Sequence, residues 1–248
     1  MTVDIPRTAM VLSAGYGKRM RPLTDDTPKP MLVLNGKPLI GHVMDRLATA
    51  GVKRAVVNLH YLGDQIKDYL AAEDRLDVTF TDEPELLETG GGVKNALAPL
   101  TETGTDPFYV VNSDAFWLDG YEDTLKRLAR EWKDDIMDGL LLLHGTVESH
   151  GYTGPGDFVA DPDGKLKRRP EMEIAPWLFA GVQILHPRIF DNSPDGKWSL
   201  NVVFDKAIES DRLYGVIHDG EWFHIGTPEG LKEADDFLNL PFAGEKKR

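Results

Sequence analysis

The sequence of 248 residues contains no cysteine. Disulfide bonds, thiolate nucleophiles and cysteine-ligated zinc sites are therefore excluded. Long hydrophobic runs are also missing, because no segment approaches the roughly 18 apolar residues that a membrane-spanning helix needs. The N-terminal segment 1–7 lacks the basic, then apolar, then small-residue order of a secretory signal peptide. By default, these absences predict a cytoplasmic protein without a membrane partner.

Positive charge is scarce as well. The formal net charge is −13, with 28 lysine and arginine residues against 41 aspartate and glutamate residues. Such a surface repels nucleic acid and anionic membranes, so we expect no nucleic-acid partner. A protein of this charge that handles phosphates must gather its basic residues locally. A phosphate site is therefore expected where basic residues cluster.

Short apolar runs alternate with segments of helical periodicity, which predicts βαβ units and an α/β fold with a mostly parallel central sheet. The expected strands are 9–14, 31–34, 55–59, 78–81, 108–111, 139–143, 177–185 and 213–218. The expected helices are 38–50, 63–70, one that begins at 93, 121–132, 202–209 and 228–238. No linker is visible, so one domain is expected over 1–240. The charged segment 241–248 is expected to form a tail.

A glycine loop follows the first apolar run directly, and proline-rich sequence surrounds Lys29 shortly after it. Gly15 and Gly17 let the backbone turn sharply and approach a ligand without a Cβ in the way. Successive backbone N–H groups in such a loop can cradle an anion. The loop also concentrates positive charge, which suits a triphosphate. The basic residues are Lys18, Arg19 and Arg21.

Two other phosphate-binding glycine motifs do not match this loop. A dinucleotide-binding Rossmann site has Gly-x-Gly-x-x-Gly, but here Met20 stands in the third glycine position and Pro22 follows. A P-loop has Gly-Lys followed by serine or threonine, whereas Gly17 and Lys18 are followed by Arg19. The plainest alternative is a strand-end turn with solvated basic residues, which the long sequence context disfavours.

The pattern Leu-x-Ala-Gly-x-Gly-x-Arg-x-x-Pro-Leu-Thr over 12–24, followed by Pro-Lys-Pro at 28–30, resembles the signature of the sugar-phosphate nucleotidyltransferases. The resemblance extends to about residue 240, and it implies a nucleotide-binding half at about 1–118 and a sugar-binding half at about 119–240. It implies a Rossmann-like, three-layer fold with the nucleotide over the carboxyl edge of the sheet. It implies that Arg19 holds the β- and γ-phosphates and that Lys29 neutralises charge on the attacked α-phosphate. The further nucleotide contacts that it implies are Leu12, Ala14, Gly15, Gly17 and Lys18.

A second glycine-rich segment, 83–94, follows the third N-terminal strand and opens a helix. Three consecutive glycines permit backbone contact with a flat base and leave helix N–H groups free, although a flexible loop would look similar. The resemblance implies that Thr89 and Gly90 contact the base. Glu83 stands where uridine and thymidine enzymes often have glutamine. A carboxylate there can accept from uracil N3–H or from guanine N1–H and N2–H₂, so Glu83 alone leaves the base open.

The run Glu-Leu-Leu-Glu-Thr-Gly-Gly-Gly most closely resembles one subgroup, the N-acetylmuramate-1-phosphate uridylyltransferases, and segments 154–158, 179–182 and 199–209 agree. This resemblance implies transfer of UMP from UTP to N-acetylmuramate 1-phosphate during cell-wall recycling, with release of pyrophosphate. Glucose- or mannose-1-phosphate nucleotidyltransferases remain as alternatives. So does a non-catalytic regulatory protein that binds nucleotide sugars on the same scaffold. A monomer or a small homo-oligomer is expected.

Asp114 ends a buried strand, where a carboxylate suits Mg²⁺, which takes hard oxygen ligands and retains waters and substrate phosphates. A turn or helix-cap role is the alternative, but Asp114 matches the metal-binding aspartate of the family. Relatives supply a second aspartate in Trp-x-Asp-x-Gly-Thr, and here His224 stands in its place. Imidazole suits Zn²⁺, Ni²⁺ or Mn²⁺ better than Mg²⁺. His224 can ligate a metal when neutral, orient a metal-bound water, or bind phosphate when protonated.

Relatives bind the sugar phosphate with Glu-Lys-Pro, and Arg-Arg-Pro at 168–170 occupies the matching place. Arg169 therefore stands for the lysine, and a guanidinium can bind a phosphate through two hydrogen bonds. A solvated basic turn is the alternative for this segment. The other expected sugar contacts are Asn112, Asp157, Gly181 and Asn201.

Overall fold

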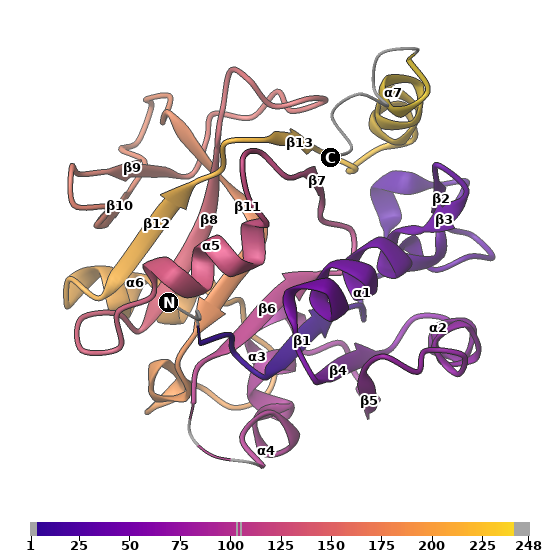
Figure 1. The fold of residues 1–248 in the computed structure, drawn as a ribbon, viewed down its shortest axis with the longest axis horizontal. Coiled ribbons are helices and arrows are strands. Elements are labelled where there is room, and N and C mark those ends of the chain that lie inside the picture. The colour runs from indigo at the N-terminus through magenta and orange to yellow at the C-terminus, as the bar shows by residue number, and fades with distance from the viewer. Residues whose placement is uncertain (1–3, 103, 105, 241–248) are drawn as a thin grey trace.

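The computed structural model describes residues 4–102, 104 and 106–240, so the expected tail at 241–248 lies outside the described residues. A nine-stranded sheet forms the centre (Figure 1), with the order β10-β9-β11-β6-β1-β4-β5 and with β8 and β12 attached through β11. Its strands are β1 (Thr8–Leu12), β4 (Arg54–Leu59), β5 (Asp77–Asp82), β6 (Phe108–Asn112), β8 (Gly139–Gly145), β9 (Phe158–Ala160), β10 (Leu166–Arg168), β11 (Trp177–Leu185) and β12 (Leu213–Ile217).

Strand direction divides this sheet clearly. β1 pairs in parallel with β4 and β6, β4 with β5, and β12 with β8. β11 is antiparallel to β6, β8 and β9, and β10 is antiparallel to β9. Only β10 and β11 therefore run against the other strands of the described sheet, which confirms the expected mostly parallel α/β fold.

Two small sheets and several helices complete the described part of the chain. β2 (Val33–Leu34) pairs with β3 (Lys37–Pro38), and β7 (Phe116–Leu118) pairs with β13 (Glu221–Phe223). The α-helices are α1 (Leu39–Ala50), α2 (Gly63–Leu70), α3 (Glu88–Asn95), α4 (Leu97–Leu100), α5 (Thr124–Glu131), α6 (Asn201–Glu209) and α7 (Pro228–Leu238). The 3₁₀ helices are η1 (Lys18–Met20), η2 (Lys29–Met31) and η3 (Pro187–Phe190).

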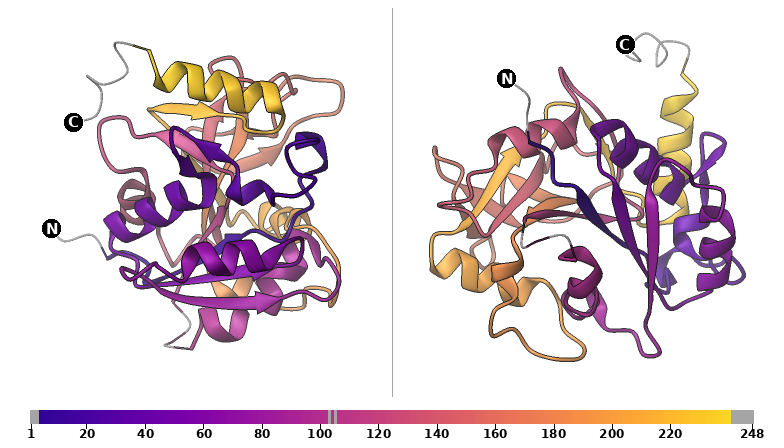
Figure 2. Two further views of the ribbon diagram at one scale, coloured as in Figure 1. Left: turned by 90° about the vertical axis from the view of Figure 1, so that its right-hand side faces the viewer. Right: turned by 60° about the horizontal axis from the view of Figure 1, so that its bottom comes forward.

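Alternation of side chains along the strands produces the three layers. In β1, Ala9 and Val11 point into the core that contains Val43 of α1 and Leu125 of α5. Met10, between them, points into the opposite core with residues of α3 and α6. Helices thus cover both faces of the sheet, as they must when both faces are apolar. The two views in Figure 2 show the same layering.

A third core cluster joins the start of the chain to its end. Met20 of η1 and Leu34 of β2 pack in one cluster with Phe116 of β7 and Phe223 of β13. Ala234 brings α7 into the same cluster, and Figure 2 shows α7 beside the β2–β3 hairpin. The backbone of the basic loop is therefore anchored by C-terminal residues far away in sequence.

Several expected elements differ from the observed ones. The first strand ends at Leu12 rather than 14, and the expected strand 31–34 divides into the end of η2 and the short β2. The helix expected over 121–132 is shorter, because Asp123 caps it by accepting a hydrogen bond from the Lys126 backbone N–H. β7, β9, β10 and β13 have only three residues each, too few to show a period. No helix in the described ranges has the length and apolar character needed to cross a membrane.

Candidate active site

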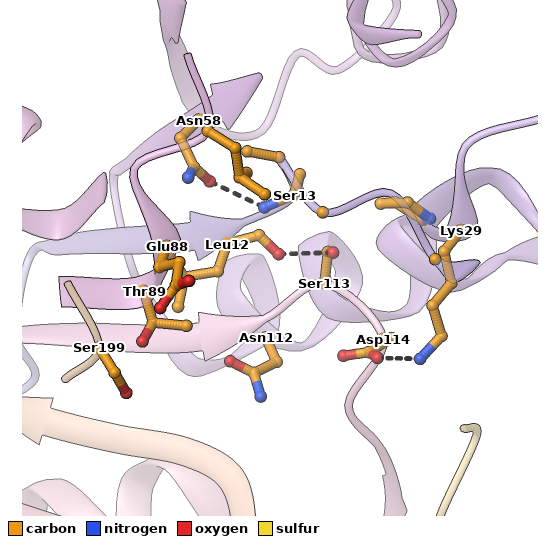
Figure 3. A pocket seen from close by; sticks show the side chains of 15 residues that line it. Leu12, Ser13, Lys29, Asn58, Glu88, Thr89, Asn112, Ser113, Asp114 and Ser199 are labelled. Carbon is orange, nitrogen blue, oxygen red and sulfur yellow. Dashed lines mark hydrogen bonds and ion pairs between the residues drawn. The ribbon is translucent and has the colours of Figure 1, made fainter. Parts of the chain in front are cut away.

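A cavity of about 410 Å³ opens at the carboxyl ends of β1, β4 and β6 (Figure 3). These strands are parallel neighbours, so their last residues meet at one edge of the sheet, where open α/β folds bind ligands. The lining residues are Leu12, Ser13, Ala14, Gly15, Gly17, Lys29, Pro30, Asn58, Leu86, Glu88, Thr89, Asn112, Ser113, Asp114 and Ser199. The cavity therefore brings together the glycine loop, the expected base segment and the expected metal ligand.

The glycine loop is held in a compact turn beneath this cavity. Gly17 has a φ of 61°, and a Cβ there would lie 3.0 Å from Cβ of Lys29 and 3.1 Å from Cγ2 of Thr24. The hydroxyl of Thr24 donates to the Gly17 carbonyl oxygen at 2.9 Å. Gly15 differs, because no atom lies within 4 Å of its ideal Cβ position. Gly17 is thus required by the turn itself, whereas Gly15 leaves open space facing the cavity.

Lys29 and Asp114 form an ion pair in the cavity wall (Figure 3). The Lys29 side chain is 14% exposed and the Asp114 side chain is 32% exposed. Burial alone would raise the pKa of Asp114, but the charge and hydrogen bond of Lys29 outweigh it and hold that pKa below its ordinary value. Asp114 is therefore an anion at neutral pH, held beside the cation expected to meet a phosphate.

His224 lies near the same pair, immediately after β13. Burial lowers the pKa of His224, the positive charges of Arg19 and Lys29 lower it further, and Asp114 opposes them. The imidazole is therefore neutral at neutral pH, the form that can bind a metal. A Cβ on Gly226 would lie 2.2 Å from the His224 Nε2 atom, so a glycine at 226 makes room for this ring. Arg19 is solvent-exposed on η1 and does not line the cavity, although its charge reaches His224.

The side chains near Lys29 can supply only part of the ligand set of a divalent metal ion. Among the described residues, no three His, Cys, Asp or Glu side chains form a group that could hold a metal ion. Asp114 and His224 offer one carboxylate and one imidazole, and Lys29 already engages Oδ2 of the carboxylate. Mg²⁺ commonly binds through one or two carboxylates plus waters and substrate phosphates. The site therefore suits a divalent cation whose remaining ligands come from a bound triphosphate.

Glu83 occupies a different place from the one that the sequence predicted. Its carboxylate is 3% exposed and does not line the cavity. Oε1 accepts from Nδ2 of Asn58 at 2.7 Å, and Oε2 accepts from the Leu87 backbone N–H at 2.9 Å. Both oxygens therefore have donors within the chain, and the carboxylate lies behind the cavity wall.

The triple glycine lies inside a helix, because α3 begins at Glu88 rather than at the expected position 93 and so includes Gly90, Gly91 and Gly92. A Cβ on Gly90 would lie 2.2 Å from the Trp198 ring, and the Gly90 N–H donates to the Trp198 carbonyl oxygen at 2.9 Å. Gly90 is therefore needed for packing against the segment before α6. Thr89 does line the cavity, and its hydroxyl oxygen accepts from the Leu200 N–H at 3.0 Å.

Of the expected sugar residues, only Asn112 lines the cavity. Gly181 has a φ of 80° within an irregular part of β11, and a Cβ there would lie 3.0 Å from Nδ2 of Asn112. Asp157 Oδ2 accepts from the Phe179 N–H at 2.9 Å, which fixes that carboxylate to β11. Asn201, at the start of α6, accepts through Oδ1 from Nη2 of Arg168 at 3.0 Å.

Arg169 is tied to its own loop, where Nη1 donates to the carbonyl oxygens of Pro170 at 3.2 Å and Glu173 at 2.9 Å. Tyr152 connects this loop to His224. Burial raises the pKa of Tyr152, Asp157 raises it further, and the charge of Arg169 lowers it. The ring of Tyr152 lies edge-on to His224, with centroids 5.7 Å apart. The sugar-side residues and His224 therefore share one continuous region.

Sequence reasoning missed several cavity residues. Asn58 carries a readable signal, since it is a polar residue near the end of an otherwise apolar strand. Ser13 lies inside the recognised signature but at one of its variable positions. Glu88 lines the cavity with a φ of 60°, which the sequence does not reveal. Ser199 comes from a segment far away in the chain, and only the folded sheet brings it to the cavity.

Comparison with known proteins agrees with this geometry. Residues 8–239 match the nucleotidyl transferase family. The chain is 39% identical over 235 residues to the N-acetylmuramate alpha-1-phosphate uridylyltransferase of Caulobacter vibrioides, covering 93% of this chain and 96% of the relative. It is also 39% identical over 231 residues to the protein of that name from Neisseria meningitidis serogroup B, covering 91% and 96%.

A solved structure gives the same fold. UDP-glucose pyrophosphorylase complexed with UDP-glucose superposes with a TM-score of 0.74 at 19% identity, covering 98% of this chain and 100% of the other. At that identity the likeness concerns the fold alone. The family match extends over nearly all the described strands and helices, and over the glycine loop, Lys29, Asp114 and His224. The chain belongs to the nucleotidyl transferase family.

Proposed function

We propose that this chain transfers UMP from UTP to N-acetylmuramate 1-phosphate and releases pyrophosphate. The observation that carries the proposal is the Lys29–Asp114 ion pair in a cavity formed beside the glycine loop. A cation next to a carboxylate, at the mouth of an anion-binding loop, is suited to a triphosphate and its divalent metal. The two uridylyltransferases at 39% identity support the choice of base and sugar.

In this reaction an oxygen of the sugar phosphate attacks the α-phosphorus of UTP, and pyrophosphate leaves from the opposite face. A phosphate monoester is already an anion at neutral pH, so no general base is needed. Catalysis then depends on positioning and on neutralising charge. We assign Lys29 to the α-phosphate and Arg19 to the β- and γ-phosphates.

The backbone of the glycine loop would bind the same triphosphate. Gly15 leaves open space beside the cavity, Gly17 holds the turn, and successive backbone N–H groups of such a loop would donate to the phosphates. Lys18 adds a positive charge at the exposed rim. Leu12, Ala14 and Thr89 line the cavity, and we assign them to the nucleoside, which would lie over the edge of the sheet.

Mg²⁺ is the proposed metal, held by Asp114 with His224 beside it. When bound, the ion would supply positive charge to the α-phosphate and the leaving pyrophosphate. The neutral imidazole of His224 would either bind the ion directly or hold one of its waters. The ion pair with Lys29 keeps Asp114 charged and fixed before the nucleotide arrives.

The sugar 1-phosphate would enter from the side of β11 and α6. Asn112 already faces the cavity, and Gly181 packs closely against it. Asp157, Arg169 and Asn201 lie around this entrance. Arg169 would exchange its carbonyl partners in the loop for the sugar phosphate, because a guanidinium pairs more strongly with a phosphate than with a neutral carbonyl.

A matrix of UTP, GTP, dTTP and ATP against N-acetylmuramate, glucose and mannose 1-phosphates tests this proposal, with phosphate detected after pyrophosphatase treatment. We expect the fastest release with UTP and N-acetylmuramate 1-phosphate, and only when Mg²⁺ is present. Preference for GTP with mannose 1-phosphate would replace the assignment with a guanylyltransferase. Nucleotide-sugar binding without release in any combination would favour a regulatory protein. Because both substrates are cytoplasmic metabolites, we place the reaction in the cytoplasm.

A further inference from the structure

Tyr16 and His60 connect the glycine loop to the end of the neighbouring strand. Tyr16 is the residue between the two loop glycines, and His60 follows the last residue of β4. The Tyr16 hydroxyl and Nε2 of His60 are 2.8 Å apart. This hydrogen bond lies outside the cavity lining, so it touches the proposed nucleotide only through the loop.

The other ring nitrogen of His60 continues the connection. Nδ1 of His60 lies 2.7 Å from the carbonyl oxygen of Glu83. A carbonyl oxygen only accepts, so Nδ1 must carry the proton, and Nε2 of the neutral ring then accepts from the Tyr16 hydroxyl. The partner groups thus select one tautomer of His60. The hydrogen bonds run without interruption from the loop to the segment before α3.

A second route joins the same two segments through the interior. The Ser13 N–H donates to Oδ1 of Asn58 at 2.8 Å, and Nδ2 of Asn58 donates to the Glu83 carboxylate at 2.7 Å. Asn58 and His60 lie two positions apart at the end of β4. The side chain of Glu83 is therefore connected through Asn58 to Ser13 at the start of the loop, and its main-chain carbonyl is connected through His60 to Tyr16 in the middle of the loop. Together, the two routes fix the loop relative to the base-side segment 83–89.

The first route, through Tyr16 and His60, depends on the hydroxyl of Tyr16 and not on burial of its ring. Tyr16 is 38% exposed, so its contribution to the core is small. The ammonium of Lys18 lies 5.3 Å from the ring centroid, within cation–π range. Replacing Tyr16 by phenylalanine removes the bond to His60 and keeps both the ring and its contact with Lys18.

We propose that Tyr16 and His60 are positioning residues that set the distance between the triphosphate loop and the base-side segment. A nucleoside triphosphate binds both parts at once, so its affinity depends on that distance. Pyrophosphate binds the loop alone, and uridine binds the base side alone, so their affinities do not. This inference rests on the proposed function only in assigning the loop to phosphates and the segment 83–89 to the base.

The test uses Tyr16→Phe, His60→Asn and the double variant of the full chain. Asparagine keeps a donor near the Nδ1 position and removes the acceptor for Tyr16. Calorimetry with Mg²⁺ gives the Kd of UTP, uridine and pyrophosphate for each protein. We expect the Kd of UTP to rise about three- to tenfold in each single variant, which is the effect of losing one hydrogen bond. The Kd values of uridine and pyrophosphate should stay within about twofold of the wild-type values.

The double variant should be no weaker than either single variant, because both changes remove the same bond. Tyr121→Phe is the matched control, since Tyr121 is 99% exposed, and it should bind UTP as the wild type does. Unchanged UTP affinity in both single variants, additive losses, or an equal loss for pyrophosphate would overturn the proposal. If the wild type prefers GTP, the same series with GTP and guanosine tests the positioning role, and only the base assignment fails.

Discussion

Lys29 and Asp114 form an ion pair in the cavity, although 85 positions separate them in the sequence. Lys29 comes from the short helix η2 after the glycine loop, and Asp114 lies two residues after the end of β6. The parallel pairing of β1 and β6 brings the two segments to one edge of the sheet. The pair is therefore a product of the fold, and four predictions follow from it and from its surroundings.

Replacing Lys29 by alanine should lower kcat by about 100-fold or more, the range seen when a charge-stabilising donor is removed from a transition state. Loss of the ammonium should also raise the pKa of Asp114, because burial then acts without the opposing charge and hydrogen bond of Lys29. Steady-state pyrophosphate release measures the rate, and thermal unfolding shows whether the fold persists. Lys53→Ala, at an exposed position, is the matched control. A near-normal kcat for Lys29→Ala would remove Lys29 from the mechanism.

Replacing His224 by aspartate should change the metal preference. A carboxylate suits Mg²⁺, whereas imidazole suits Mn²⁺ better. We expect the ratio of kcat with Mg²⁺ to kcat with Mn²⁺ to rise by about tenfold. Substitutions of residues around a bound metal typically change activity by this much or more. Activity titrations with each ion give this ratio. An unchanged ratio would mean that the side chain at 224 does not contact the cation.

Gly15 and Gly90 should respond oppositely to alanine. Gly15→Ala places its methyl group in open space at the cavity, so stability should hold while UTP affinity falls. Gly90→Ala drives a methyl group into the Trp198 ring, and we expect a loss of about 1–3 kcal/mol in unfolding free energy, as for other overpacked sites. Urea unfolding and UTP calorimetry on both variants separate the two effects. Equal loss of stability in both variants would contradict the assigned surroundings.

Stability should fall on the acid side of neutrality, in part through His218. Burial lowers the pKa of His218, and nearby His144 lowers it further. Between the folded pKa and the unfolded value of about 6.5, the unfolded chain binds more protons, so stability rises with pH in that window. The contribution is complete above that unfolded value and is lost as the pH falls toward the folded pKa.

Within the window, one such group contributes a slope of up to about 1.4 kcal/mol per pH unit. His218→Gln keeps a donor toward the Leu118 carbonyl oxygen, which His218 Nε2 contacts at 3.0 Å, and removes the titration. Urea unfolding at pH 5 and pH 7.5 should show a smaller difference for the variant than for the wild type. An equal difference in the two proteins would exclude His218 as a source of the pH dependence of stability.

The long periodic elements of the fold were predictable, and the short ones were not. α2 and α7 match their expected bounds, since their apolar positions, and the cap at Thr227 for α7, are local signals. β7 and β13 have three residues each and form only because they pair with each other, about one hundred positions apart. The local sequence of either segment does not predict such pairing.

The candidate site divides in the same way. Eight of the predicted site residues line the cavity, and most of these belong to the contiguous glycine motif or follow a strand end. They are Leu12, Ala14, Gly15, Gly17, Lys29, Thr89, Asn112 and Asp114. Glu83 shows the limit of this reasoning. Its position was recognised, but the orientation of its carboxylate depends on Asn58, on another strand.

The position of a bound triphosphate tests the account most directly. A crystal structure with Mg²⁺ and a non-hydrolysable UTP analogue would show it. We predict that the β- and γ-phosphates contact the backbone N–H groups of 15–19 and the guanidinium of Arg19. The α-phosphate should lie beside Lys29, with the cation between it and Asp114. A triphosphate bound elsewhere, or a cation away from Asp114, would contradict the account.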